Sequence, residues 1–332
     1  MWVETLPKTF DPSVEFGIPG ARWFDSTSVV EGCRPVGFRF YRHIVNIDAK
    51  LGTRKLTASG EADSLELART KAQSELIERW ALLSSSDCQQ AETSNGWAAH
   101  PNRDQAKLNA VFELVERDAA LSQWYSATPL FQIPNNELPA RFREWTTKEL
   151  SRSEFPELSV MISTKGIGPS VMCILKNENG FGVSGHATRR TLDESIAAAL
   201  AEACRAAHST LRREYWGDTL KLKRGEPGGV DPGAHSVYYA YHEPFPKWIF
   251  GSQLTWAAAD AQWSARIEAV TSQLGDFSFQ TVLESPIFVG FVKHPLAFEL
   301  RWGSTSVEDV LRSPGAKRIG LISVNKETHV VS

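Results

Sequence analysis

The chain has 332 residues, of which 42% are hydrophobic and 23% charged, and its formal net charge is −3. This length and composition are typical of a globular protein with a sizeable core, and the near-neutral charge provides no general attraction to nucleic acid or to a membrane surface. No apolar run reaches the roughly 20 residues that a membrane-spanning helix needs.

Hydrophobic periodicity predicts the helices in chain order. Leu65, Ala68, Ala72 and Leu76 recur at three- or four-residue steps, which indicates a helix that begins near Asp63. The same type of pattern predicts further helices along the rest of the chain, and a charged stretch over 139–149 indicates a surface helix. The full set of predicted helices is 63–84, 104–125, 139–149, 192–213 and 256–274.

Short runs rich in β-branched and aromatic residues predict strands between these helices. The predicted strands are 36–48, 55–58, 159–163, 171–176, 181–184, 287–292 and 318–324. A polar connection is expected over 85–103 and an irregular loop over 214–250, because both are rich in turn-forming residues. Helices and strands do not alternate strictly, which favours an α+β fold built on mixed or antiparallel sheets. One domain over 1–332 is expected, with 251–332 as its carboxyl-terminal part.

The amino-terminal segment and the cysteines favour a cytoplasmic protein. The opening MWVETLPKTFDPS lacks the basic and then apolar layout of a signal peptide. The four cysteines, Cys33, Cys88, Cys173 and Cys204, are far apart and form no CxxC pair. Reduced structural thiols are therefore expected.

A pseudo-repeat contains the candidate metal-binding residues. Residues 75–81 read ELIERWA and residues 113–119 read ELVERDA, so each segment places two glutamates at i and i+3 on one helical face. Two such helices could present four carboxylates to one another. Like charges held close cannot all stay ionised without cations, and Mg2+ is the natural occupant because it favours carboxylate oxygen and brings phosphate with it.

Two other interpretations of the repeat remain open at this point. Glu-x-x-Glu-Arg on a solvated helix often forms only surface ion pairs. A dinuclear carboxylate redox centre normally uses Glu-x-x-His on two of its helices, and neither copy here has that histidine.

The flanking residues resemble the YcaO family of backbone-amide-activating proteins. The resemblance covers residues 17–210 and rests on four stretches in family order. These are DSTSVVEGCRPVGF, SGEADSLELARTKAQSELIERWAL, SNGWAAHPNRDQAKLNAVFELVERDA and GHATRRTLDESIAAALAEACRAA.

The resemblance implies ATP and Mg2+ as cofactors, held by a cage of glutamates on long helices of a single YcaO-like domain. The implied magnesium ligands are Glu75, Glu78, Glu113, Glu116 and Glu202. The implied ATP-binding residues are Lys71, Arg79, Asn109, Arg117 and Arg205. No side chain is assigned a covalent catalytic role.

It also implies a reaction and partners. The expected enzyme is an ATP-dependent cyclodehydratase of peptide natural-product biosynthesis, which gives azoline rings (thiazoline or oxazoline), thioamides or amidines. The expected partners are a precursor peptide and a leader-peptide-binding protein, within a homodimer or hetero-complex, without nucleic acid or membrane.

Three departures from the family pattern keep an alternative open. Lys71 stands where the family has serine, Ala198 stands where it has arginine, and the chain ends THVVS rather than in a proline-rich tail. The alternative is a non-catalytic YcaO-like subunit or scaffold of a peptide-modifying complex.

Overall fold

The computed structural model of the protein describes residues 2–4, 29–31, 40–51, 54–84, 95–213, 215–226, 233–284, 287–298 and 306–329. These residues form two compact units. The first contains the described residues of Met1–Arg34, Tyr41–Val111 and Phe277–Lys293, and the second those of Pro35–Phe40, Phe112–Asp276 and His294–Ser332.

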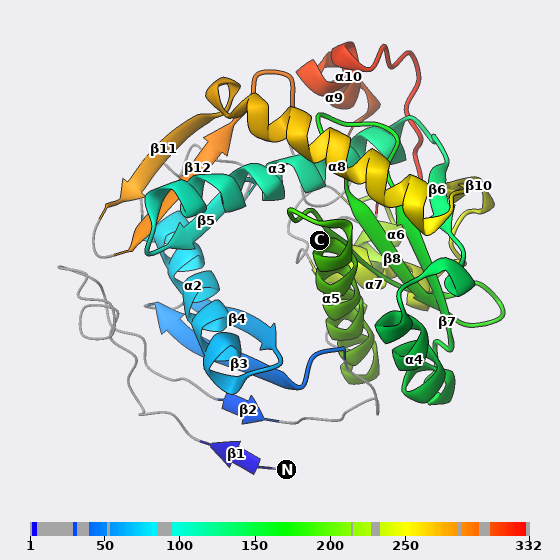
Figure 1. The fold of residues 1–332 in the computed structure, drawn as a ribbon, viewed down its shortest axis with the longest axis horizontal. Helices are drawn as coiled ribbons and strands as arrows, with labels where there is room; N and C mark the ends of the chain where they lie inside the picture. Colours follow the sequence, from blue (N-terminus) through cyan, green and yellow to red (C-terminus); the bar gives the residue numbers. More distant parts are fainter. Residues whose placement is uncertain are drawn as a thin grey trace. The chain divides into compact units, whose positions relative to one another are not determined.

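A helix packed on a β-hairpin forms one part of the first unit (Figure 1). The antiparallel strands β3 (His43–Leu51) and β4 (Arg54–Ala62) carry helix α2 (Leu65–Ser84). Gly60 allows this close packing, because a Cβ atom there would lie 2.0 Å from the carbonyl oxygen of Ala68.

The first unit also contains a three-stranded antiparallel sheet. Its order is β11 (Ser278–Leu283), β12 (Phe288–Lys293) and β5 (Trp97–His100). Trp97 and Phe291 stack with ring centroids 4.8 Å apart and join a core with residues of α2. The short antiparallel pair β1 (Trp2–Glu4) and β2 (Val29–Glu31) also belongs to this unit.

The second unit is built on a five-stranded sheet with the order β10-β6-β7-β8-β9. The strands are β10 (Phe250–Gln253), β6 (Leu130–Ile133), β7 (Glu157–Ile162), β8 (Val171–Lys176) and β9 (Gly182–Ala187). All neighbouring pairs are antiparallel except β10 with β6.

Helix α5 (Leu192–Arg212) lies against β8 and β9 (Figure 1). It begins at a capping box, in which the Glu194 N–H donates to the Thr191 side chain and the Glu194 carboxylate accepts from the Thr191 N–H. Gly185 of β9 allows the same close approach as Gly60, since its Cβ would lie 2.2 Å from the Ala199 carbonyl oxygen.

The remaining helices include one that runs from the first unit into the second. This helix is α3 (Arg103–Tyr125), and Glu113 and Glu116 lie in its second-unit part. The other α-helices are α4 (Ala140–Lys148), α6 (Trp216–Lys223), α7 (Gly233–Tyr241), α8 (Trp256–Ser272), α9 (Val307–Arg312) and α10 (Pro314–Arg318). Short 3-10 turns cover Asn135–Glu137, Leu150–Arg152, Lys247–Ile249 and Leu274–Asp276.

The α+β fold class is confirmed, but two predicted segments were wrong. The expected irregular loop over 214–250 contains α6 and α7 and ends where β10 begins, because its glycines and prolines are concentrated at helix boundaries. The expected strand over 318–324 is absent from these described residues. α10 ends at Arg318, Gly320 turns the chain at φ +64°, and the Ile322 side chain is 93% exposed.

The structure also corrects smaller points. The connection 85–103 contains β5, and of the predicted strand 36–48 only the part from His43 is strand, while 36–39 lie outside the described residues. The single domain over 1–332 stays a prediction. Among the described residues, no helix combines the length and the apolar character that crossing a membrane requires.

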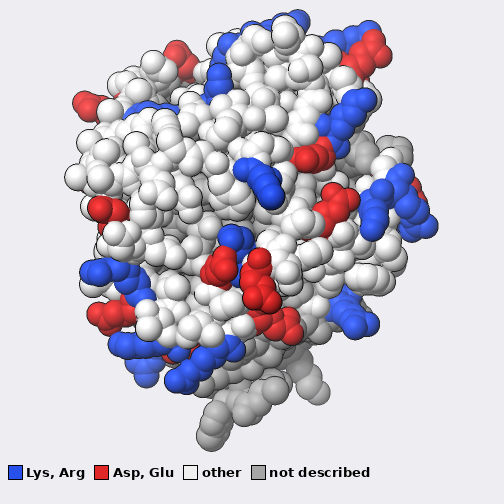
Figure 2. All heavy atoms as spheres, turned by 90° about the vertical axis from the view of Figure 1, so that its right-hand side faces the viewer, with Lys and Arg blue, Asp and Glu red and all other residues white. Residues whose placement is uncertain are grey.

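Figure 2 displays one face of the molecule, on which lysine and arginine are interspersed with aspartate and glutamate. Neither sign forms a broad continuous field on that face. This mixture agrees with the small net charge of the chain, and that face lacks the basic stripe that nucleic-acid binding uses.

Candidate functional site

The first unit holds the carboxylates of the first Glu-x-x-Glu segment at two strands. Glu75 accepts a hydrogen bond from the Ser59 N–H of β4 at 2.6 Å, and its other oxygen pairs with Arg79 at 2.7 Å. Glu78 accepts from the Ala99 N–H of β5 at 2.6 Å. Because each carboxylate is oriented by a backbone donor of a strand, its position is set by the fold as well as by the helix.

Lys71 and Asn109 also lie in this unit. The Lys71 ammonium donates to the Glu61 carbonyl oxygen at 2.9 Å and lies 5.3 Å from the ring centroid of Tyr41. These contacts tie Lys71 to the hairpin and to the residues before it. Asn109 is exposed on α3. Their predicted contact with ATP stays a prediction.

In the second unit, three predicted magnesium ligands are grouped around the end of β9. Glu202 accepts from the His186 N–H at 2.7 Å, and Glu116 accepts from the Thr188 N–H at 3.0 Å. Glu113 pairs with Arg117 at 3.0 Å. The end of β9 and the residue that follows it therefore supply alternate backbone N–H groups to carboxylates from two helices, α3 and α5.

Glu116 is the electrostatic centre of this group. Burial raises the pKa of its carboxyl to about 8, Arg189 and Arg117 oppose the rise, and the charges of Glu202 and Glu113 add to it. A carboxyl in such surroundings keeps its negative charge only when more positive charge is supplied. The donor set therefore fits a hard cation such as Mg2+, for which carboxylate oxygen is the preferred ligand.

Arg189 was not among the residues singled out from the sequence. Its Nη1 lies 3.7 Å from Glu116 Oε2 and donates to the Thr188 carbonyl oxygen at 2.7 Å. Its backbone N–H donates to Ser195 Oγ at 2.8 Å. The only local signal is the Arg189-Arg190 pair between a strand and a helix cap, and that signal does not distinguish the two arginines.

The loop 163–170 between β7 and β8 holds the residue that orients Glu116. Asp118 accepts from the Ile167 N–H, the Gln123 side chain accepts from the Thr164 N–H, and the Arg266 guanidinium donates to three carbonyl oxygens of the loop. The Thr188 hydroxyl donates to the Pro169 carbonyl oxygen at 2.8 Å. The residue whose N–H orients Glu116 is thus itself held by this loop.

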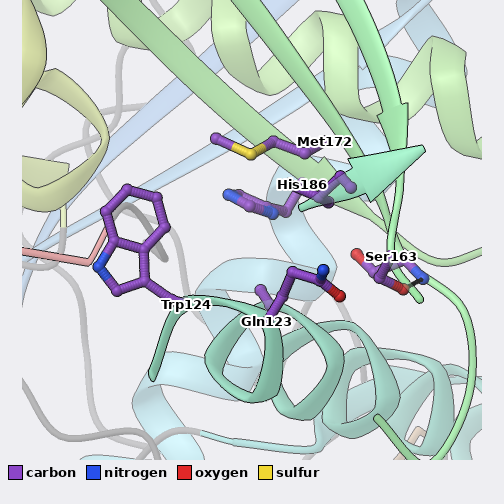
Figure 3. Close-up of a pocket in the computed structure, with 8 residues that line it drawn as sticks. Gln123, Trp124, Ser163, Met172 and His186 are labelled. Atoms are coloured by element: carbon purple, nitrogen blue, oxygen red, sulfur yellow. Dashed lines mark hydrogen bonds between the residues drawn. The ribbon is translucent and has the colours of Figure 1, made fainter. Parts of the chain in front are cut away.

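A small cavity of about 10 Å3 lies beside His186, enough for about one water molecule. Figure 3 shows the imidazole reaching between Met172 and Gln123 toward Trp124. Its Nε2 is buried without a hydrogen-bond partner among the described residues. Burial lowers the pKa of His186 to about 4, so the ring is neutral near pH 7. The contact of His186 with the carboxylates that the structure shows is its backbone N–H bond to Glu202.

The remaining predicted residues lie on or near α5. Arg205 is half-buried on this helix, and its contact with ATP stays a prediction. Cys173 and Cys204 are buried and unbonded to one another, and burial raises the pKa of the Cys173 thiol. These two thiols are therefore poor nucleophiles. Cys33 and Cys88 lie outside the described residues.

Within the part of the chain that the structure describes, no three acidic, histidine or cysteine side chains converge as a ready-made metal centre. Mg2+ commonly takes one or two carboxylates and completes its coordination with water and substrate phosphates. The arrangement therefore fits a metal that arrives with a phosphate ligand better than a permanently held ion.

Comparison with known proteins identifies the family. The sequence profile of the YcaO cyclodehydratases, described as binding ATP and Mg2+, matches residues 85–283, which is more than half of the chain. No curated protein matches the chain. The family description confirms the prediction of ATP and Mg2+ as cofactors.

Three solved structures share the fold. YcaO from Methanopyrus kandleri bound with AMPPCP and Mg2+ has a TM-score of 0.55 and 13% identity over 77% of this chain and 82% of that chain. A heterocyclase in complex with substrate and cofactor has a TM-score of 0.57 and 13% identity over 90% of this chain and 54% of that one, so the chain spans about half its length. The E. coli microcin synthetase McbBCD complex with pro-MccB17 bound has a TM-score of 0.56 and 11% identity over 85% and 90%. With the family profile, these likenesses establish that the chain belongs to the YcaO family.

Proposed function

We propose that the protein is an ATP- and Mg2+-dependent enzyme that activates backbone amides of a peptide by O-phosphorylation. A thiol or hydroxyl of the substrate adds to the preceding carbonyl carbon, and the resulting oxyanion takes the γ-phosphoryl group of ATP, which releases ADP. Phosphate then leaves with the former carbonyl oxygen. The peptide loses the elements of water and gains an azoline ring; with external sulfide or an amine as nucleophile, the product is a thioamide or an amidine.

The observation that carries this proposal is the buried carboxylate group of the second unit. Glu116 has its pKa raised to about 8, and it is oriented by the Thr188 backbone N–H that follows the end of a strand. Solvated surface glutamates do not have these properties. Phosphoryl transfer depends on positioning and charge neutralisation, which oriented carboxylates supply through a bound metal.

The proposed site residues keep the roles that the sequence indicates. Mg2+ supplies charge neutralisation at the phosphates when it is bound. The proposed magnesium ligands are Glu75, Glu78, Glu113, Glu116 and Glu202, and the proposed ATP contacts are Lys71, Arg79, Asn109, Arg117 and Arg205.

A peptide substrate is supported by similar proteins. One structural neighbour is a heterocyclase in complex with its substrate, and another is a microcin synthetase complex with a bound pro-peptide. We therefore propose a precursor peptide as substrate, a leader-peptide-binding partner, and a homodimeric or hetero-complex form that works in the cytoplasm.

One observation favours a second candidate function, a non-catalytic subunit of a peptide-modifying complex. Lys71, which replaces the family's serine, donates to the Glu61 carbonyl oxygen, and this hydrogen bond holds its ammonium group at the hairpin. Ala198 also lacks the charge of the arginine it replaces. Such a subunit would bind nucleotide weakly even with its partner present.

Calorimetry with ATP and Mg2+ tests both candidates. The variants are Glu78→Gln in the first unit, Glu116→Gln in the second, and Glu66→Gln as the matched control, because Glu66 is an exposed residue of the same helix as Glu78. We expect Mg2+-dependent binding by the wild type, weakened at least about tenfold by either site variant and unchanged by the control.

The outcomes separate the two functions. Wild-type binding that both site variants weaken supports the enzyme, and peptide-dependent release of phosphate would then be measured with the partner. Absence of wild-type binding, alone and with the partner, would reject the enzyme in favour of the scaffold. Equal effects of Glu66→Gln and Glu78→Gln would remove the first Glu-x-x-Glu segment from the site.

A further inference from the structure

We propose that Arg189 binds a phosphate group of the nucleotide, and that its pairing with Glu116 is the resting arrangement of this contact. The proposal rests on the proposed function, because it needs a nucleotide with Mg2+ at the carboxylates of the second unit. It adds a residue that the sequence pattern did not assign.

The first argument is orientation. The backbone of Arg189 is anchored to Ser195 Oγ, and its Nη1 donates to the Thr188 carbonyl oxygen. Thr188 is the residue whose N–H orients Glu116. The guanidinium is thus attached to the same two-residue segment that holds the carboxylate, so it is directed to the site before any ligand binds.

The second argument is unused hydrogen-bonding capacity. A guanidinium has five N–H donors in a planar fork. Among the described residues, only the bond to Thr188 uses one of them, because the 3.7 Å separation from Glu116 is too long for a hydrogen bond. The side chain is 48% exposed. Several donors are therefore available to an incoming ligand.

The third argument is charge. The fully ionised group contains three carboxylates (Glu113, Glu116 and Glu202) and the guanidiniums of Arg117 and Arg189. The net charge of this group is therefore −1, and one bound Mg2+ changes it to +1. Glu116 then has the metal as its counter-charge, and Arg189 is left beside an anion-binding site, where a guanidinium pairs well with phosphate oxygens.

Two other roles of Arg189 predict different effects of its removal on the binding of Mg2+ and ATP. If Arg189 were a permanent replacement for a metal at Glu116, its removal would free the carboxylate and strengthen Mg2+ binding together with ATP binding. If it only held Glu116 in place, its removal would weaken binding of the metal alone. A phosphate contact predicts weaker Mg–ATP binding without weaker binding of the metal alone.

The experiment is calorimetry of the full chain with Mg–ATP and, separately, with Mg2+ alone. The variants are Arg189→Gln, Arg189→Lys and the matched control Arg190→Gln, because Arg190 is the exposed neighbour and makes none of these contacts among the described residues. Thermal unfolding checks that each variant is folded.

We expect Arg189→Gln to weaken Mg–ATP binding ~10- to 100-fold, the range for loss of charge-assisted hydrogen bonds. Arg189→Lys should recover part of the loss, and Arg190→Gln should stay within about twofold of the wild type, as should Mg2+ alone for every variant. Unchanged or tighter Mg–ATP binding by Arg189→Gln overturns the proposal, as does equal weakening of Mg2+ alone. A wild type that does not bind Mg–ATP overturns the proposed function itself, and Arg189 with it.

Discussion

Asp118 joins four segments of the second unit through one buried carboxylate. Its side chain is fully buried, and it accepts from the N–H groups of Phe298 and Ile167, both at 2.8 Å, and from Arg318 Nη1 at 2.9 Å. Arg318 also donates to Ser122 of the same helix. We predict that Asp118→Asn strongly destabilises the protein although it changes the side-chain shape little.

The magnitude follows from what the asparagine cannot do. In either orientation its amide NH2 would face a donor, either the Phe298 N–H or those of Ile167 and Arg318, and the half-buried guanidinium would lose its only paired carboxylate among the described residues. Breaking a buried ion pair costs about 3–5 kcal/mol. Arg318 is 17% exposed and so can be partly hydrated, which places the expected loss near 3 kcal/mol.

A double-mutant cycle measures the interaction itself. Unfolding free energies from urea titration of Asp118→Asn, Arg318→Gln and the double variant should give a coupling of about 2 kcal/mol, the range for hydrogen bonds to charged groups. The control is the cycle for Glu308 and Arg312, an exposed i,i+4 pair that should couple by about 0.3 kcal/mol. A loss below about 1 kcal/mol for Asp118→Asn, or a coupling no larger than that of the control, would refute the reasoning.

Other features of the second unit give further expectations. Burial holds the pKa of His235 at about 4, below its ordinary 6.5, so the unfolded chain takes up the proton first and stability falls as pH drops from 6.5 toward 4. Between pH 7 and pH 5 the wild type should therefore lose about 2 kcal/mol more unfolding free energy than His235→Gln, and identical pH profiles would contradict this assignment. Arg266→Gln removes donors from three carbonyls of the loop 163–170 and should cost about 2–4 kcal/mol, with faster amide hydrogen exchange in that loop; unchanged exchange would exclude the support role. Gly166→Ala should cost more than about 2 kcal/mol in thermal unfolding, because φ is +107° and the new Cβ would lie 2.5 Å from a backbone atom, whereas Gly275→Ala, with open space around it, should change stability by less than about 0.5 kcal/mol; similar melting of the two variants would count against the steric argument.

The parts of the fold that the sequence predicted well are locally encoded. Helix α5 begins at Leu192 as predicted because Thr191 and Glu194 form a capping box within four residues. Strand β8 has the predicted bounds, Val171–Lys176, because a short apolar run ends at a turn with Asn177. In both cases the deciding interactions lie within a few residues of the boundary.

The parts that the sequence did not predict depend on distant contacts. Helix α7 (Gly233–Tyr241) is buried over most of its length, so its residues show no amphipathic period. Strand β10 has four residues and is parallel to β6, which lies more than a hundred residues earlier in the chain. No local pattern distinguishes such short elements from loops.

The candidate site has the same division. The i, i+3 glutamates and the arginines after them could be read from the helical repeat alone. The groups that orient the carboxylates could not, because the Ser59, Ala99, His186 and Thr188 backbones reach them from 16 to 72 residues away. A hydrogen bond from a backbone N–H does not require a particular residue type at the donor position. Even a longer sequence motif would therefore not have identified these four donor residues.

The difference between backbone and side-chain contacts of the carboxylates determines which substitutions could remove the function. A carboxylate oriented by a peptide N–H keeps its partner through almost any side-chain substitution at the donor position, since every residue except proline supplies the same group. The raised pKa of Glu116 arises instead from burial and from neighbouring charges, which single substitutions change readily. Replacement of Arg189 or Arg117 would alter the charge at Glu116 while leaving its position intact. We therefore expect that changes in the arginines around the carboxylates, more than changes in the glutamates, distinguish an enzyme on this fold from a scaffold. Calorimetry of Arg189→Gln beside Glu116→Gln compares the effects of the two kinds of substitution on Mg–ATP binding directly.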